Sequence, residues 1–297
     1  MPSLKEVKNR ISSVESTQQI TKAMKMVAAA KLRKAQDMIV KLRPYADKLT
    51  KLQEHIVSGL NEDDIITSPY VLIRDVHKVL VVVIGSDRGL CGAFNTSTFK
   101  KAVQLLENNY RLMLPDHVTV MPVGKKAMEF FKRRSYPVNN SFHDIGHEFS
   151  FEKVAEMADY LMDGFIKHKY DRVVLVYNEF KNAATQILKE ENYLPLVSGL
   201  FTSAEDPGVS DYIFEPDKEE LLSEIIPTSL RIQLYKAFLD SNASEQGARM
   251  VAMEKATENA GELLRQLRLT YNRTRQATIT REILEIVAGA EALSSGD

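Results

Sequence analysis

Residues 28–49 read AAAKLRKAQDMIVKLRPYADKL, and small and apolar side chains recur along this stretch at regular steps. The steps alternate between four and three residues, at Ala28, Leu32, Ala35, Ile39, Leu42, Ala46 and Leu49. Such alternation places one stripe of side chains along a helix that pairs with another helix. Ser3 followed by Glu6 matches a capping box, so the helix is expected to begin there, within an N-terminal helical segment of residues 1–58.

Pro44 lies inside this pattern and has no backbone N–H to donate. The stripe keeps its phase on both sides of Pro44, so we expect a kink at this residue and not the end of the helix. Gly59 follows the last periodic residues, and glycine commonly lies just beyond a helix end. The first helix is therefore expected to stop near Ser58.

The C-terminal part of the chain repeats the spacing, at Met250, Met253, Thr257, Ala260, Leu264, Leu267, Tyr271 and Thr274. No proline follows Pro227, so we expect a long helix over residues 228–297, preceded by a separate short helix. At ~1.5 Å per residue, the N-terminal helix alone would extend roughly 85 Å, which is too long for a compact domain of this mass. The sequence predicts that the two terminal helices pair as a long antiparallel coiled coil, with residues 59–227 inserted between them as a domain.

The last turns of the C-terminal helix are apolar around most of their circumference. The residues concerned are Ile279, Ile283, Leu284, Ile286, Val287, Ala288, Ala290 and Leu293. A helix that is apolar all round is not left in water. It is either enclosed by a partner protein or folded back on the inserted domain, and we favour the partner because no second stripe offers the helix a docking face.

The inserted part reads as an α/β domain. Residues 78–84, KVLVVVI, form a continuous β-branched run that ends at Gly85, which is typical of a buried parallel strand. Further strands are expected at 118–123, 172–180 and 185–196, a short extended piece at 211–215, and helices at about 96–110, 125–134 and 151–168. This alternation predicts a Rossmann-like, doubly wound and mostly parallel sheet.

The charge of the chain is nearly balanced overall but unevenly distributed. The sequence has 39 basic and 40 acidic residues, yet residues 1–58 carry +7, residues 228–297 are neutral and the middle carries −8. The single cysteine excludes an internal disulfide and a thiolate zinc cluster. No apolar run approaches the ~20 residues that span a bilayer, and the N-terminus does not resemble a secretory signal. We therefore expect a soluble intracellular protein without direct membrane insertion.

Residues 85–92, GSDRGLCG, follow the first strand, where a phosphate-binding loop lies in many α/β proteins. The glycines at 85, 89 and 92 match neither common phosphate-loop pattern, and no lysine follows them. A tight turn with packing glycines is the favoured interpretation, and a nucleotide-binding enzyme is the alternative. Cys91 has no His or second Cys nearby in sequence, so we expect a buried side chain and not a nucleophile.

Two other kinds of site can be weighed from the sequence. His143 and His147 have a spacing that chelates metals on a helix, with Glu148 adjacent, but Gly146 indicates a loop, so neither a metal nor a cofactor is expected. The basic first helix is compatible with a coiled-coil nucleic-acid adaptor. Interleaved aromatic residues are missing from it, so nucleic acid is not an expected partner.

Four strings resemble the gamma subunits of F-type ATP synthases. They are STQQITKAMKMVAAAKLRKAQ (16–36), SDRGLCGAFN (86–95), SEQGARMVAMEKATENAGELL (244–264) and LTYNRTRQATITREILEIVAGAEAL (269–293). The resemblance runs from end to end, although residues 100–227 match only in layout. It implies a non-catalytic central rotor shaft that carries torque between the membrane c-ring and the catalytic beta subunits.

The resemblance also implies partners and contact residues. The alpha and beta subunits would form a ring around the terminal helices, the epsilon subunit and the c-ring would contact the α/β domain, and delta would be present only within the complex. Arg275 and Gln276 match a polar contact with a loop of beta. Met24 and Lys25 match the collar where the basic helix passes the acidic base of beta.

Two further surfaces follow from the resemblance. The apolar tip, which we define as Ile279, Ile283, Ile286, Val287 and Leu293, would turn inside a hydrophobic sleeve. Tyr212 and Glu215 would lie near epsilon and the c-ring. No catalytic, cofactor-binding or metal-binding residue is implied. The family resemblance and the absence of a chloroplast-type cysteine pair favour a peripheral complex on the cytoplasmic face of a bacterial inner membrane.

Overall fold

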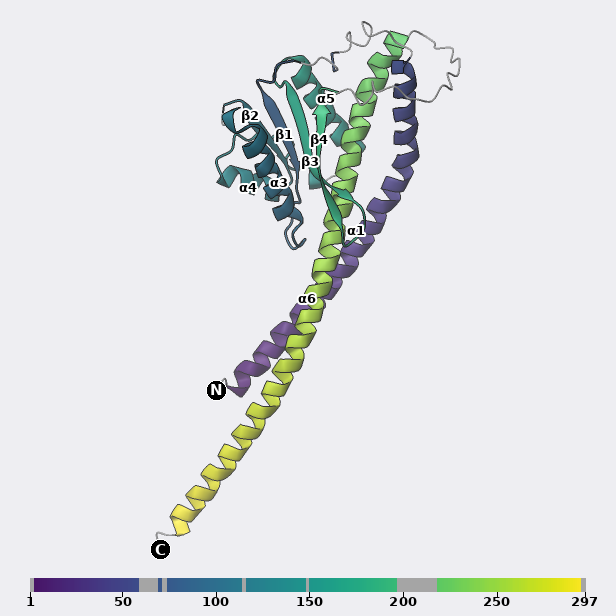
Figure 1. Ribbon diagram of the computed structural model, residues 1–297. Coiled ribbons are helices and arrows are strands. Elements are labelled where there is room, and N and C mark those ends of the chain that lie inside the picture. Colours follow the sequence, from purple (N-terminus) through teal and green to yellow (C-terminus); the bar gives the residue numbers. More distant parts are fainter. Residues whose placement is uncertain are drawn as a thin grey trace. The chain divides into compact units, whose positions relative to one another are not determined.

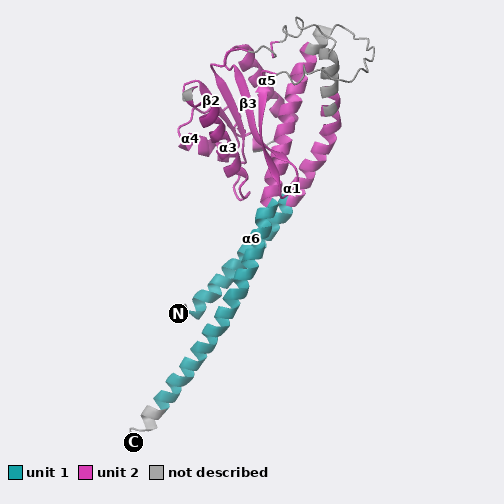
Figure 2. Ribbon diagram, viewed as in Figure 1, with its two compact units in different colours: residues 1–28, 250–297 teal, residues 29–249 magenta. Residues whose placement is uncertain are grey.

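The computed structural model describes residues 3–58, 69–70, 74–113, 116–147, 150–196 and 218–294. It contains two compact units, which Figure 2 colours separately. Unit 1 consists of Met1–Ala28 with Met250–Asp297, and unit 2 consists of Ala29–Arg249. Helix α1 (Leu4–Ser58) and helix α6 (Lys218–Ser294) each contribute residues to both units.

Unit 2 contains a four-stranded sheet. Its elements, in chain order after α1, are β1 (Val79–Ile84), α3 (Phe94–Asn109), a short 3-10 helix (Arg111–Met113), β2 (Val118–Val123), α4 (Lys125–Arg133), a second 3-10 helix (Ile145–His147), α5 (Phe151–Ile166), β3 (Arg172–Phe180) and β4 (Gln186–Leu194). The strand order is β2-β1-β3-β4; β1 is parallel to β2 and β3, whereas β4 is antiparallel to β3 (Figure 1). The expected mixed α/β fold with a mostly parallel sheet is confirmed.

Strand β1 is buried on both of its faces, which explains its unbroken apolar sequence. Leu80, Val82 and Ile84 belong to a core that includes side chains of α5 and α6. The alternate residues of β1 belong to a second core with side chains of α3 and α4. Because successive side chains of a strand point to opposite faces, one run of six apolar residues supplies both cores.

The start of α6 differs from the expectation of a separate short helix before residue 228. The helix begins at Lys218 and runs through Pro227 without interruption. Ile226 and Leu230, on either side of the proline, are both buried in the core that α6 shares with the sheet. Packing on this face keeps the helix continuous where the local preference of proline opposes it.

Helix α1 is continuous through Pro44 and ends at Ser58, as expected. The kink at Pro44 remains a prediction. The extended piece expected at residues 211–215 lies outside the described residues.

Unit 1 is an antiparallel pair of helices. Arg268 forms an ion pair with Glu15, Thr257 is hydrogen-bonded to Thr21, and Glu254 forms an ion pair with Lys25. Residue numbers therefore fall along α6 as they rise along α1. Among the expected stripe positions of this unit, Ala28, Met253, Ala260 and Leu264 are buried. The stripe is thus the face along which the two helices pack.

Candidate functional site

The end of α6 carries a series of exposed apolar side chains. Ile279, Ile283, Ile286 and Val287 are between 47% and 71% exposed. The side chain of Leu293 lies outside the described part of the structure, although its backbone belongs to α6. Apolar side chains exposed along a helix in this way are unfavourable in water and are typical of a protein contact.

Arg275 and Gln276 lie on α6 just before this apolar stretch, and both side chains are exposed. Among the residues that the structure describes, neither side chain has a hydrogen bond or an ion pair. A guanidinium group and an amide together offer several directional donors, which suit a carboxylate or carbonyl of another chain. Their geometry is compatible with a polar partner contact next to the apolar one.

Met24 and Lys25 lie on α1 in unit 1. Met24 is half-buried, and the ammonium group of Lys25 forms an ion pair with Glu254 of α6. Lys25 therefore already has a carboxylate partner within the chain. The Lys25 side chain is still 38% exposed, so its contact with a second protein remains a prediction.

The turn after β1 is held together by its own side chains. The Ser86 amide donates to Asn95 Oδ1 over 3.0 Å, and Asn95 Nδ2 donates to Ser86 Oγ over 2.7 Å. Cys91 is buried beside them and accepts a hydrogen bond from Asn95 Nδ2 at 3.3 Å. A Cβ atom at Gly85 would lie 3.0 Å from Ala127 and Phe99, so this glycine permits close packing of the turn. The geometry matches the expected packing turn better than a phosphate-binding loop.

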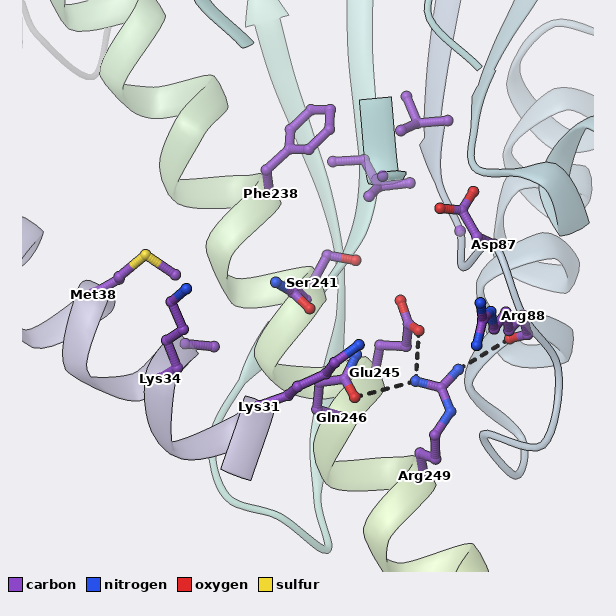
Figure 3. A pocket seen from close by; sticks show the side chains of 16 residues that line it. Lys31, Lys34, Met38, Asp87, Arg88, Phe238, Ser241, Glu245, Gln246 and Arg249 are labelled. Carbon is purple, nitrogen blue, oxygen red and sulfur yellow. Dashed lines mark hydrogen bonds and ion pairs between the residues drawn. The ribbon is translucent and has the colours of Figure 1, made fainter. Parts of the chain in front are cut away.

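Arg249 of α6 fastens this turn to the helix. Its guanidinium donates to the carbonyl oxygen of Gly89 at 3.4 Å. It also donates to the carbonyl oxygen of Arg88 at 3.0 Å and forms an ion pair with Glu245 at 2.7 Å (Figure 3). Burial raises the pKa of the Glu245 carboxyl, and Arg249 opposes that rise. This half-buried pair is a structural link within unit 2, because its donors and acceptors are largely used by one another.

A cavity of about 440 Å³ lies beside this link, lined by residues of α1, α6 and the ends of β1 and β2. Its charged lining consists of Lys31, Lys34, Asp87, Arg88, Glu245 and Arg249. Asp87 accepts a hydrogen bond from the backbone amide of Lys125 at the start of α4. The two carboxylates of the lining therefore have partners within unit 2, and the cavity has a net positive lining.

The histidines weighed as metal ligands do not form a cluster in the described residues. The ring Nδ1 of His143 is 2.8 Å from the carbonyl oxygen of Asn140. The side chain of His147 and the whole of Glu148 lie outside the described residues. In the described ranges, no group of three or more His, Cys, Asp or Glu side chains is placed to hold a metal ion. Tyr212 and Glu215 also lie outside the described part of the chain.

Sequence patterns missed two contacts and one buried carboxylate. The ion pair of Glu245 with Arg249 has helical i,i+4 spacing, which would have revealed it. The bond between Thr21 and Thr257 joins distant parts of the chain, and only the polar stripe position at 257 hinted at it. The burial of Asp240 on α6 had no signal in the sequence, because a carboxylate within a helix ordinarily faces water.

Three comparisons with known proteins are consistent with this geometry. The family model described as ATP synthase matches residues 3–293. The ATP synthase gamma chain of Cytophaga hutchinsonii is 50% identical over 297 residues, which cover 99% of this chain and 100% of the relative. In the described residues, no helix is both long and apolar enough to cross a membrane.

Solved structures match the chain as well. A chain of the Euglena gracilis mitochondrial ATP synthase, in a structure of OSCP, F1 and c-ring, is 25% identical with a TM-score of 0.67, covering 99% of this chain and 95% of that one. A chain of the Tetrahymena thermophila mitochondrial ATP synthase central stalk and c-ring is 28% identical with a TM-score of 0.55, covering 80% of this chain and 99% of that one. From the match of the family model and the full-length relatives, the chain belongs to the family of ATP synthase gamma chains.

Proposed function

We propose that this chain is the central rotor shaft of an F-type ATP synthase and performs no bond chemistry itself. The observation that carries the proposal is the pair of long antiparallel helices, one of which ends in an exposed apolar surface. The full-length similarity to gamma chains supports the same role. Ion flow through a membrane c-ring would turn the shaft, and the shaft would bias the catalytic sites of the beta subunits.

The proposed assembly follows from this role. The alpha and beta subunits surround the terminal helices, the epsilon subunit and the c-ring contact the α/β part, and delta joins only through the complex. The complex lies on the cytoplasmic face of a bacterial inner membrane. The Euglena match lies in a structure of OSCP, F1 and c-ring, and the Tetrahymena match lies in a structure of a central stalk and c-ring, which supports the contacts with F1 and the c-ring.

The proposed domain organisation consists of the three segments expected from the sequence. Residues 1–58 and 228–297 form an antiparallel coiled coil, and residues 59–227 form a Rossmann-like domain inserted between them. The stripe of buried residues on both helices supports the coiled coil.

Each contact surface has a separate task in this proposal. The apolar tip turns inside a hydrophobic sleeve, where non-directional contacts slide with a low barrier. Arg275 and Gln276 make directional hydrogen bonds to a beta loop that form and break at each step. Met24 and Lys25 pass the acidic base of beta, and Tyr212 and Glu215 face epsilon and the c-ring.

Torque transmission requires an asymmetric shaft. A shaft shifts a catalytic site between open and closed states only through contacts that differ between those states. An off-axis bend at Pro44 and the α6 residues that continue past the start of α1 supply such asymmetry.

Replacing Pro44 with alanine tests the bend. Alanine restores the missing backbone donor, so the helix is expected to straighten and become more stable. We expect ATP synthesis driven by an ion gradient to fall about threefold, the effect of about 0.7 kcal/mol in the bias between states. The measurement is the initial rate of synthesis in inverted membrane vesicles. An unchanged rate would remove Pro44 from the mechanism.

Two binding experiments test the proposed function as a whole. Co-expression with alpha and beta subunits should yield a complex that retains this chain through purification and hydrolyses ATP. Equilibrium dialysis of the full-length chain against ATP should show no saturable binding. Tight stoichiometric ATP binding without assembly would instead favour the nucleotide-binding enzyme.

A further inference from the structure

The helix pair of unit 1 has a polar centre. Thr257 Oγ1 of α6 lies 2.8 Å from Thr21 Oγ1 of α1, and Gln18 Nε2 of α1 donates to the carbonyl oxygen of Thr257 over 3.3 Å. Thr21 is only 9% exposed. We call Gln18, Thr21 and Thr257 the polar layer. Its hydrogen bonds run between the two helices, in a stripe whose other buried positions are apolar or small.

The neighbours of the polar layer are adapted to it. On one side, Lys25 and Glu254 form an ion pair between the same two helices. On the other side, a Cβ atom at Gly261 would lie 3.0 Å from Gln18 Nε2, so the glycine leaves room for the glutamine amide. Glycine within a helix is unfavourable relative to alanine. Its presence at this position is explained by the space that Gln18 occupies.

The apolar stripe alone does not determine how far one helix is displaced along the other. Its spacing repeats every seven residues, so a displacement by seven residues would again bring stripe against stripe. Such a step moves one helix by about 10 Å along the other. Small side chains such as Ala28 and Ala260 interlock weakly and oppose this displacement little.

The polar layer distinguishes the native register from the displaced ones. After a seven-residue step, Thr21 would face Met250 or Leu264 in place of Thr257. Lys25 would face Gly247 or Gly261 in place of Glu254. Each threonine hydroxyl can still donate to its own helix, to Gln18 O or to Met253 O, so the displaced states lose the bonds between the helices and not the helices themselves.

We propose that the polar layer, together with the ion pair of Lys25 and Glu254, fixes the axial register of the two helices of unit 1. Buried polar residues in helix pairs have this effect when their partners exist in one alignment only. As a consequence, the residues of α6 keep a fixed axial position relative to those of α1 under torsional load. The inference rests on contacts within unit 1 and does not depend on which partner encloses the helices.

Pulsed electron paramagnetic resonance on the full-length chain tests the register. Spin labels are attached at Lys8→Cys on α1 and Lys255→Cys on α6, both exposed, in a Cys91→Ser background. The parent should give one narrow distance distribution. The double variant Thr21→Val with Thr257→Val keeps side-chain shape but removes the hydroxyls, and it should show a further population displaced by about 10 Å.

The matched control is the double variant Thr17→Val with Thr270→Val. Both of these threonines are exposed and donate only to carbonyl oxygens of their own helices. The control should keep the parent distribution. If the Thr21→Val, Thr257→Val distribution superimposes on that of the control, the polar layer does not set the register and the proposal is overturned.

A second set of variants decides the matter if the valine pair fails to fold. Lys25→Glu alone places two carboxylates together, and it should broaden the distance distribution. Adding Glu254→Lys restores opposite charges with the order reversed and should return the distribution to that of the parent. A single variant without effect, or a double variant that stays broad, would contradict the role of the ion pair.

Discussion

Replacing Arg275 with alanine should lower ion-driven ATP synthesis by the assembled complex at least tenfold. Arg275 is exposed on α6, and the proposed function assigns its guanidinium to a polar group of a beta loop. Hydrogen bonds to charged groups contribute about 1.5–3 kcal/mol, and about 1.4 kcal/mol corresponds to a factor of ten. The rate of synthesis in vesicles with an imposed ion gradient measures this effect.

The stability of the chain should be unaffected by the same change. An exposed side chain without partners in the described chain contributes little to folding, so unfolding free energy should change by less than about 0.5 kcal/mol. Arg273→Ala is the matched control, because Arg273 is also exposed but lies on another side of α6. Equal losses of ATP synthesis in the two variants would contradict the assignment of Arg275 to a contact with beta. A loss of stability comparable to that of a core substitution would also contradict it.

Asp240→Asn should stabilise the chain at neutral pH and not at acidic pH. Asp240 of α6 is only 4% exposed and lies at a small cavity of about 110 Å³ in unit 2. Burial raises the pKa of the Asp240 carboxyl from 3.8 to about 6; Lys236, Lys189 and Arg43 oppose the rise and Glu179 adds to it. The ionised carboxylate is therefore less favourable in the folded chain than in the unfolded chain.

The sign and size of the effect follow from this difference in pKa. Well below pH 3.8 the carboxyl is protonated in both states, so asparagine changes little. As the pH rises from about 4 to about 6, the unfolded chain loses its proton first, and native stability falls. Above that range asparagine should stabilise the chain by roughly 3 kcal/mol, at about 1.4 kcal/mol per pKa unit.

Urea unfolding of the full-length chain between pH 4 and pH 8 measures this prediction. Asp163→Asn is the control, because Asp163 is exposed and its carboxylate pairs with Lys167 one helical turn away. The control should show no stabilisation that grows with pH. A constant difference between the Asp240 variant and the parent at all pH values would contradict the account of the buried carboxyl.

Much of the fold was predictable because it depends on local periodicity. The unbroken apolar run at β1 and the boundaries of β2 and β3 follow from strand patterns, and α1 follows from its stripe. The expectation failed at Pro227, where burial of Ile226 and Leu230 outweighs a local preference. Contacts of this kind form only in the assembled core, so they cannot be predicted from a short stretch of sequence.

Only part of the candidate site was predictable from sequence patterns. Exposure of the apolar tip follows from an all-round apolar helix, and the structure agrees at Ile279, Ile283, Ile286 and Val287. The polar contact at Arg275 and Gln276 came from the family resemblance and not from spacing. The pairing of Lys25 with Glu254 was not foreseen, because it joins residues 229 positions apart.

A single-molecule rotation experiment shows whether the chain turns as a rotor shaft. The chain is assembled with alpha and beta subunits that are fixed to a surface, and a bead is attached through Lys132→Cys, an exposed position on α4. If the chain is the rotor shaft, the bead should rotate continuously in one direction while ATP is hydrolysed and stop when ATP is removed. A bead that stays still while the same complexes hydrolyse ATP at their normal rate would contradict the account.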